Sequence, residues 1–128
     1  MELTVGLAGE AIAQVDSSNT ASTMGSGNLE VFATPSMVAL MEKAATNALK
    51  EHMPLDSSSV GTLIDVRHMA ATPVGMTVTA KAVLTAVEGK RLVFSVEAFD
   101  DKEKIGEGTH ERFIVNCERF IAKANGKK

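Results

Sequence analysis

Three side chains in this sequence have types and positions suited to acid–base or nucleophilic chemistry. Glu42 is an acid that falls within the apolar stripe of a predicted helix, and Thr34 begins the same helix two turns earlier. His68 falls on the apolar face of a predicted strand. A hydroxyl, a carboxylate and an imidazole that titrates near neutral pH can together activate water or attack a carbonyl carbon. We expect them to share one partly buried site if the strand packs on the helix.

Each of the three residues also has a simpler structural explanation. Thr34 precedes Pro35, and a threonine in this position is typical of a helix cap. His68 fits a hydrogen-bonded core or interface residue, and Glu42 fits a side chain that extends to solvent from the margin of the stripe. The sequence leaves both explanations open for each residue, and their convergence on one helix–strand contact favours the catalytic one.

The other histidines do not join this set. His52 falls at the end of the predicted helix, where a cation complements the helix dipole, and we interpret it as structural. His110 lies in the charged run THERF, which is typical of a surface or interface position. Cysteine and histidine do not cluster at metal-ligand spacing and no glycine-rich phosphate fingerprint is present, so we predict no metal and no cofactor.

The helix that carries Thr34 and Glu42 falls within residues 31–53. Thr34 is expected to be its N-cap and Pro35 its first residue, and Pro54 follows its end. Between these limits, apolar residues recur at helical spacing and form a wide stripe, made of Val38, Leu40, Met41, Ala44, Ala45, Ala48 and Leu49.

Segments of alternating apolar and polar residues surround this helix and predict strands. They lie at 3–15, 59–69, 76–87, 91–99 and 105–117. A polar loop at 16–27 precedes the helix, and the closing lysines indicate a solvated tail. We therefore predict an α+β fold in which one helix covers an antiparallel sheet of about five strands, the last four forming a meander. Because one helix leaves apolar sheet surface bare, a second copy of the chain is expected to cover it.

Size and composition limit the classes of function. The 128 residues fit one domain, and 45% hydrophobic with 23% charged residues is typical of a globular protein. A net charge of −3 without a basic stripe argues against a nucleic-acid partner. No apolar run reaches the roughly 18 residues that span a bilayer, and no signal-peptide pattern or disulfide pair occurs. We therefore predict a cytoplasmic protein without a membrane partner.

Three runs of sequence carry a resemblance to a known family. VFATPSMVALMEKAA, SSVGTLIDVRHMAATPVGMTV and GEGTHERFIV are similar to hot-dog-fold thioesterases of the fluoroacetyl-CoA thioesterase type. The similarity covers nearly the whole chain, and the combination of ATP, ALMEKAA, SVGT, VRHMAATP and GTHER is specific. The resemblance implies a long helix wrapped by an antiparallel sheet, a homodimer or higher oligomer, and an active site at the subunit interface.

The resemblance also implies a catalytic set of Thr, Glu and His, which corresponds to Thr34, Glu42 and His68. It associates Gly61 and Arg112 with substrate binding. The predicted function is hydrolysis of a short-chain acyl-CoA thioester to the free acid and CoA. The chain departs from the family before the helix, where TMGSGNLEVF holds only Phe32 and the fluoroacetyl-specific lid carries phenylalanine. A short acyl group other than fluoroacetyl is therefore expected.

Two other functions fit the same fold, since fold does not fix function. One is a non-catalytic acyl-CoA binding or sensing module, and the other is a hydratase or dehydratase that uses a His/carboxylate pair. The phosphates of CoA need cationic partners in every case, and the candidates in the sequence are Arg67, Lys81, Arg91 and Arg112.

Overall fold

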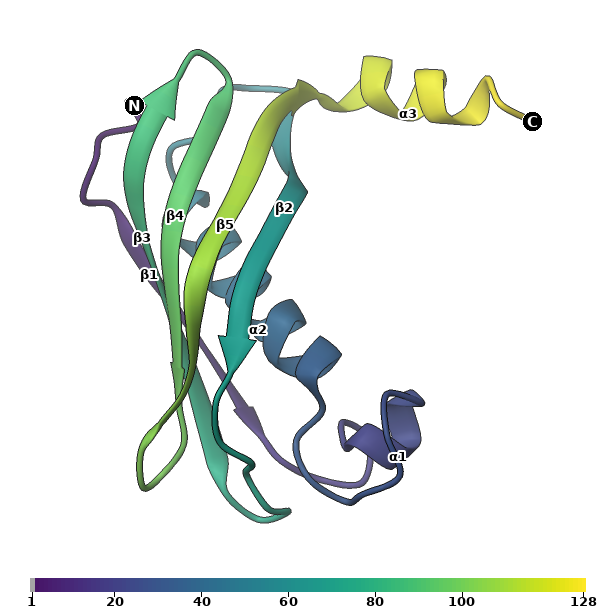
Figure 1. The fold of residues 1–128 in the computed structure, drawn as a ribbon. Coiled ribbons are helices and arrows are strands. Elements are labelled where there is room, and N and C mark those ends of the chain that lie inside the picture. The colour runs from purple at the N-terminus through teal and green to yellow at the C-terminus, as the bar shows by residue number, and fades with distance from the viewer. Residues whose placement is uncertain (1) are drawn as a thin grey trace.

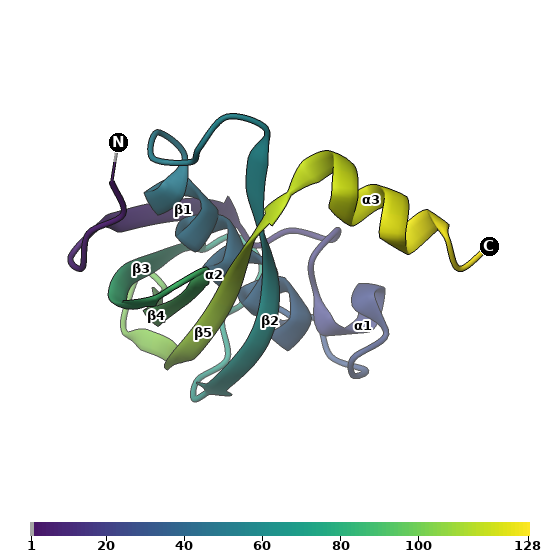
Figure 2. The ribbon, with the colours of Figure 1, turned by 90° about the horizontal axis from the view of Figure 1, so that it is seen from above.

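The computed structural model describes residues 2–128 and consists of a strongly curved sheet that wraps around one long helix (Figure 1). In chain order the elements are β1 (Ala8–Gln14), α1 (Ala21–Met24), α2 (Thr34–Leu49), β2 (Ser57–His68), β3 (Thr77–Glu88), β4 (Arg91–Phe99), β5 (Lys104–Asn116) and α3 (Cys117–Asn125). The view from above shows α2 within the curve of the five strands (Figure 2). The predicted α+β architecture is confirmed.

The order of strands in the sheet differs from the prediction. All neighbouring pairs are antiparallel, and the order is β1-β3-β4-β5-β2. Only β3, β4 and β5 form a meander, because β2 crosses to the far edge and pairs with β5. The predicted four-stranded meander is wrong, since alternation identifies a strand without identifying its neighbour. As a result β2 is an edge strand with β5 on one side only.

Small residues allow α2 to pack closely on the sheet. Its buried face consists of Met37, Leu40, Met41, Ala44, Ala45, Ala48 and Leu49. A Cβ added at Gly9 in β1 would lie 2.3 Å from the carbonyl oxygen of Ala44 and 2.4 Å from the amide nitrogen of Ala48. Since real Cβ atoms do not approach backbone this closely, glycine is required where β1 crosses the helix.

Both ends of α2 differ from the prediction. Ala33 is the N-cap, with extended φ/ψ of −74° and 143° and no side-chain hydrogen bond, and Thr34 is the first helical residue. The predicted capping role of Thr34 is therefore wrong. The helix ends at Leu49, before the end of the predicted segment. No helix within residues 2–128 combines the length and apolar character that would let it cross a membrane.

The segment before α2, residues 16–31, forms a loop that is closed at its base; we call it the α1 loop. Thr20 is buried and pairs with Phe32 in an isolated antiparallel bridge. The amide of Ala21 donates to the carbonyl of Val31 at 2.8 Å, and the amide of Ser22 donates to that of Leu29 at 3.1 Å. The tip is exposed, including Leu29. The predicted polar loop is present and contains the single-turn helix α1.

The chain ends in a helix that the sequence analysis missed. Asn116 caps α3 by accepting a hydrogen bond from the amide of Arg119 at 3.0 Å. No residue of α3 is buried, and the helix projects away from the sheet (Figure 1). The tail is exposed as predicted, but the sequence analysis did not predict the helix, whose apolar side chains Phe120 and Ile121 stay exposed.

Candidate active site

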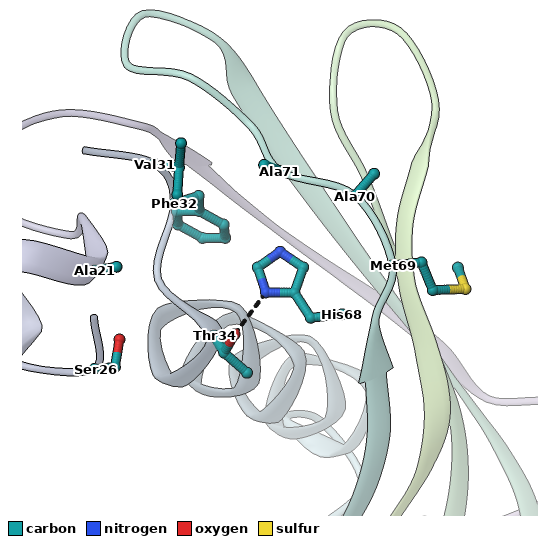
Figure 3. Close-up of a pocket in the computed structure, with 9 residues that line it drawn as sticks. All are labelled: Ala21, Ser26, Val31, Phe32, Thr34, His68, Met69, Ala70 and Ala71. Carbon is teal, nitrogen blue, oxygen red and sulfur yellow. Dashed lines mark hydrogen bonds between the residues drawn. The ribbon is translucent and has the colours of Figure 1, made fainter. Parts of the chain in front are cut away.

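Thr34 and His68, from the first turn of α2 and the last residue of β2, contact each other directly. The Oγ1 atom of Thr34 lies 2.7 Å from Nδ1 of His68 (Figure 3). The other ring nitrogen, Nε2, is buried and has no hydrogen-bond partner among residues 2–128. The hydroxyl of Thr34 therefore serves the imidazole and not the helix, which explains why it does not act as a cap.

The imidazole lies in the wall of a cavity of about 250 Å³ between the α1 loop and the end of β2. The cavity is lined by Ala21, Ser26, Val31, Phe32, Thr34, His68, Met69, Ala70 and Ala71. Figure 3 shows the ring facing Phe32, with the side chain of Met69 turned away. Burial lowers the pKa of His68, and the nearby polar backbone of Ala70 opposes this shift. The ring is therefore neutral at pH 7 and can accept or donate a proton through Nε2.

Glu42 projects from α2 toward Arg112 on β5. The Nη1 atom of Arg112 lies 3.5 Å from Oε2 of Glu42, and the two side chains are 7% and 40% exposed, respectively. The guanidinium is fixed from its other edge, because Nε donates to Oγ of Ser59 at 2.8 Å and Nη2 donates to the Ser59 carbonyl at 2.9 Å. Burial lowers the pKa of Arg112, and Glu42 opposes this shift. Glu42 thus does not simply extend into solvent: it faces a buried cation while part of it stays accessible.

Gly61 of β2 provides the space that the Glu42 carboxylate occupies. A Cβ at this position would lie 2.6 Å from Oε2 of Glu42, 3.2 Å from Cε1 of His110 and 3.4 Å from Nη1 of Arg112. A β-bulge between Gly61 and Leu63 shifts the register of β2 against β5 at this point. Bulges of this kind re-aim side chains and are frequent beside active sites.

His110 belongs to the same cluster, although the sequence analysis assigned it to the surface or an interface. Its side chain is 0% exposed; Nδ1 lies 2.8 Å from the Leu63 carbonyl oxygen and Nε2 lies 3.2 Å from Nη1 of Arg112. Burial lowers the pKa of His110, and the positive charge of Arg112 lowers it further. The hydrogen bond to the Leu63 backbone and the negative charges of Glu42 and Glu111 oppose this shift.

Alternation along β5 was the signal that could have found His110. Both His110 and Arg112 share parity with Ile114, and all three turn to the inner side of the sheet. The charged residue types of THERF outweighed this pattern in the sequence analysis.

The two groups of candidate residues are well separated within one chain. Thr34 and Glu42 are offset by about 12 Å along the helix axis, and Gly61 and His68 are roughly 20 Å apart along β2. The structure thus brings Thr34 to His68. It brings Glu42 to Gly61 and Arg112. The Glu42 carboxylate does not reach the His68 imidazole of the same chain. Residues 2–128 also contain no group of three His, Cys, Asp or Glu side chains arranged to hold a metal ion.

Comparison with known families identifies the chain. The profile of the fluoroacetyl-CoA-specific thioesterases matches residues 15–118. The chain belongs to this family. A fluoroacetyl-CoA thioesterase from Streptantibioticus cattleyicolor is 49% identical over 98 residues, which cover 77% of this chain and 70% of that protein. The family resemblance expected from the sequence is confirmed.

Solved structures agree with this membership. The fluoroacetyl-CoA thioesterase FlK is 39% identical with a TM-score of 0.93, covering 100% of this chain and 99% of that one. A variant of FlK in complex with acetyl-CoA also has a TM-score of 0.93, at 39% identity, covering 98% of this chain and 99% of that one. A hot-dog-like protein from Thermanaerovibrio acidaminovorans is 26% identical with a TM-score of 0.88, covering 98% and 93%. The predicted hot-dog fold is confirmed.

The contact between Gly61 and Glu42 predicts a selective effect in this thioesterase-family chain. In Gly61→Ala the new methyl group displaces the end of a flexible side chain, so the free energy of unfolding should change by less than about 1 kcal/mol. The misplaced carboxylate should lower kcat for thioester hydrolysis about ten- to a hundredfold. Denaturant unfolding and steady-state kinetics measure the two effects. Gly126→Ala, in the C-terminal turn, is the matched control, and an unchanged kcat in Gly61→Ala would contradict the prediction.

The half-buried His68 and the buried His110 predict a dependence of stability on pH. The pKa values of His68 and His110 are lowered from 6.5, so between pH 6.5 and the lowered values the unfolded chain binds more protons than the folded chain. Stability should therefore be full above pH 6.5 and should fall as the pH drops below it, by at most about 1.4 kcal/mol per pH unit for each histidine. Denaturant unfolding from about pH 7.5 to 5.5, at fixed protein concentration, tests this. Stability that stays constant or rises over this range, or a slope that His110→Phe does not reduce, would contradict it.

Proposed function

We propose that this chain is a homodimeric acyl-CoA thioesterase that hydrolyses a short-chain acyl-CoA to the free acid and CoA, with Thr34, Glu42 and His68 as its catalytic residues. The observation that carries the proposal is the pair of half-sites on β2. One holds a neutral imidazole oriented by Thr34 at a cavity lined by no lysine, arginine or carboxylate, and the other holds a partly exposed carboxylate beside buried Arg112. Each half-site supplies what the other lacks.

The free edge of β2 supports a dimer that joins the half-sites. This strand has β5 on one side only, and its exposed side chains include Leu63 and Ile64, at 43% and 37%. An unpaired edge with apolar side chains favours pairing with another strand. Antiparallel pairing of two β2 strands about a two-fold axis between Ile64 and Asp65 sets Gly61 opposite His68 of the partner subunit.

This pairing gives two equivalent sites, each assembled from both subunits. Glu42, beside Gly61 of one subunit, faces Thr34 of the partner subunit and His68 of the partner subunit. The separation of roughly 20 Å along β2 within one chain is then no obstacle, because the carboxylate and the imidazole belong to different copies. The exposed Phe120 and Ile121 of α3 offer a surface for larger assemblies.

A cytoplasmic location stays a prediction.

The chemistry follows from the roles of the three groups. In one route, Glu42 takes a proton from water while the water oxygen attacks the thioester carbonyl carbon. In the other, the Glu42 carboxylate attacks this carbon itself and forms an anhydride, which water then hydrolyses. In both routes the C–S bond breaks, the acid is released and the CoA sulfur receives a proton. His68 of the partner subunit carries this proton through Nε2, because Nδ1 is occupied by Thr34.

Backbone amides provide stabilisation for the developing oxyanion. The amide of Met37 is not among them, since it donates to the carbonyl of Ala33 at 3.0 Å. The amide of Ser36 belongs to the first turn of α2, where amides lack partners within the helix. The amide of Gly61, beside the Glu42 carboxylate, is the second candidate.

The phosphates of CoA fit Arg67 better than the other cations considered. Arg91 already pairs with Glu88 and with Glu111, the latter at 2.8 Å. Lys81 lies 3.8 Å from Glu10, and Arg112 is buried. By contrast Arg67 is exposed, precedes His68 on β2, and forms no ion pair with residues 2–128. A planar guanidinium in this position can bind a phosphate with two hydrogen bonds.

The cavity beside His68 suits a short, uncharged acyl chain. Its lining includes alanines and Val31, and none of the residues that line it is a lysine or arginine. A carboxylated acyl group would find no cation there. Phe32 is the aromatic side chain that lines the cavity, and the exposed tip of the α1 loop carries no aromatic residue. The proposed substrate is therefore a short acyl-CoA without selectivity for fluorine.

Loss of either acid–base group should abolish turnover. We expect Glu42→Gln and His68→Ala each to lower kcat about a hundredfold or more on a panel of short acyl-CoAs, measured with a thiol reagent. The matched controls Glu103→Gln and His52→Ala should retain full activity. Full activity in both site variants would exclude the mechanism. Saturable binding of acyl-CoA without release of thiol would indicate a binding module, and enoyl product from a 3-hydroxyacyl-CoA would indicate a dehydratase.

A shared site predicts complementation between the two inactive variants. Mixed and reassociated Glu42→Gln and His68→Ala chains form heterodimers in which one site contains both lesions and the other contains neither. We expect activity to recover to about a quarter of the wild-type rate, since about half of the dimers are mixed and each has one intact site. The rate is measured against each variant reassociated alone. Absence of recovery, with heterodimers shown by mass spectrometry, would contradict the shared site.

A further inference from the structure

His110 is a fully buried polar side chain to which the proposed mechanism assigns no role. It is 0% exposed, and it stands two residues from Arg112 on the inner face of β5. The ring stacks on Phe94 of the neighbouring strand, with centroids 6.2 Å apart and an interplanar angle of 29°. Both ring nitrogens of a buried histidine need hydrogen-bond partners within the protein, and these partners indicate its role.

The partners of His110 fix its tautomer. Nη1 of Arg112 lies 3.2 Å from Nε2, and arginine has donors but no acceptor, so Nε2 must accept. The ring proton then resides on Nδ1 and is donated to the carbonyl of Leu63 at 2.8 Å. His110 is therefore a neutral, oriented acceptor, held between a guanidinium and the strand that carries the β-bulge.

The guanidinium nitrogen of Arg112 that contacts His110, Nη1, also faces Glu42. Nη1 of Arg112 lies 3.2 Å from His110 and 3.5 Å from Oε2 of Glu42, while Ser59 holds Nε and Nη2. With one hydrogen of Nη1 directed to His110, the other is directed to the carboxylate. A neutral acceptor such as His110 orients the guanidinium without forming an ion pair with it. An acid at position 110 would compete with Glu42 for the charge of Arg112.

We propose that His110 is a positioning residue that orients Arg112, and through Arg112 the carboxylate of Glu42, for thioester hydrolysis. This inference rests on the proposed function, in which Glu42 is catalytic. The ring nitrogens of His110 are engaged by the Leu63 carbonyl and by Nη1 of Arg112, so His110 acts on the carboxylate through Arg112. Its effect should appear in turnover and not in substrate binding, because it acts on the reacting carboxylate through one intermediate side chain.

Two substitutions separate this role from a general contribution to the core. His110→Gln can present its amide oxygen where Nε2 stands, so it retains the acceptor for Arg112 and loses the donor to Leu63. His110→Asn can present its amide nitrogen where Nδ1 stands, so it retains the donor to Leu63 and leaves Arg112 without its acceptor. Both variants place an amide in the same buried site, so their effects on stability should be comparable.

We expect His110→Gln to keep kcat within about threefold of the wild type, and His110→Asn to lower kcat about tenfold or more with little change in KM. In an Arg112→Met background the difference between Gln and Asn at position 110 should vanish, since the residue through which His110 acts is gone. Equal losses in the two variants, or a difference that persists without Arg112, would overturn the proposal.

A measurement on the unmodified protein keeps the test independent of whether the variants fold. Nitrogen-15 NMR of labelled wild-type protein should show His110 neutral at pH 7, with its proton on Nδ1 and Nε2 unprotonated. A proton on Nε2 would overturn the proposal, because Arg112 could not donate to it. If the wild type releases no thiol from any acyl-CoA, the proposed function fails whatever the tautomer. If it does release thiol and His110→Asn retains wild-type kcat, only the present inference fails.

Discussion

Close packing of α2 on the curved sheet is the constraint on which the other features depend. The helix presents Ala44, Ala45 and Ala48 to the strands, and β1 crosses it at Gly9, where no side chain fits. A larger residue at these points would move the helix outward. Because Thr34 and Glu42 are fixed to this helix and their partners are fixed to β2 and β5, the same packing sets both hydrogen-bonded pairs of the site.

Much of the fold follows from the sequence. The periodicity of residues 31–53 and the alternation after them are sufficient to predict one helix against about five strands, and the predicted range 91–99 is that of β4. Other features need tertiary information. Nothing in the alternation of β2 indicates that it pairs with β5, and a threonine before a proline fits the N-cap and the first helical position equally well. The contact with His68, 34 residues away, decides how Thr34 is used.

The sequence analysis named the candidate residues on α2 and β2, but it missed His110 and did not predict the geometry of the site. Helical spacing places Thr34 and Glu42 on similar faces, yet it does not show that two turns also separate them by about 12 Å. The charges of THERF concealed the burial of His110 and Arg112, which depends on their mutual hydrogen bond and on Ser59. A polar residue type predicts exposure only when no hydrogen-bond partner is available to offset the cost of burial. Here the partners lie on strands far away in the sequence.

The α1 loop has a consequence for how this fold diversifies. Its base is closed by the bridge between Thr20 and Phe32, whereas its tip contributes no buried side chain to the core. Substitutions or insertions at the tip therefore alter the cavity entrance without removing a contact that holds α2 to the sheet. The shape of the cavity entrance can therefore change while Thr34, His68 and Glu42 keep their positions.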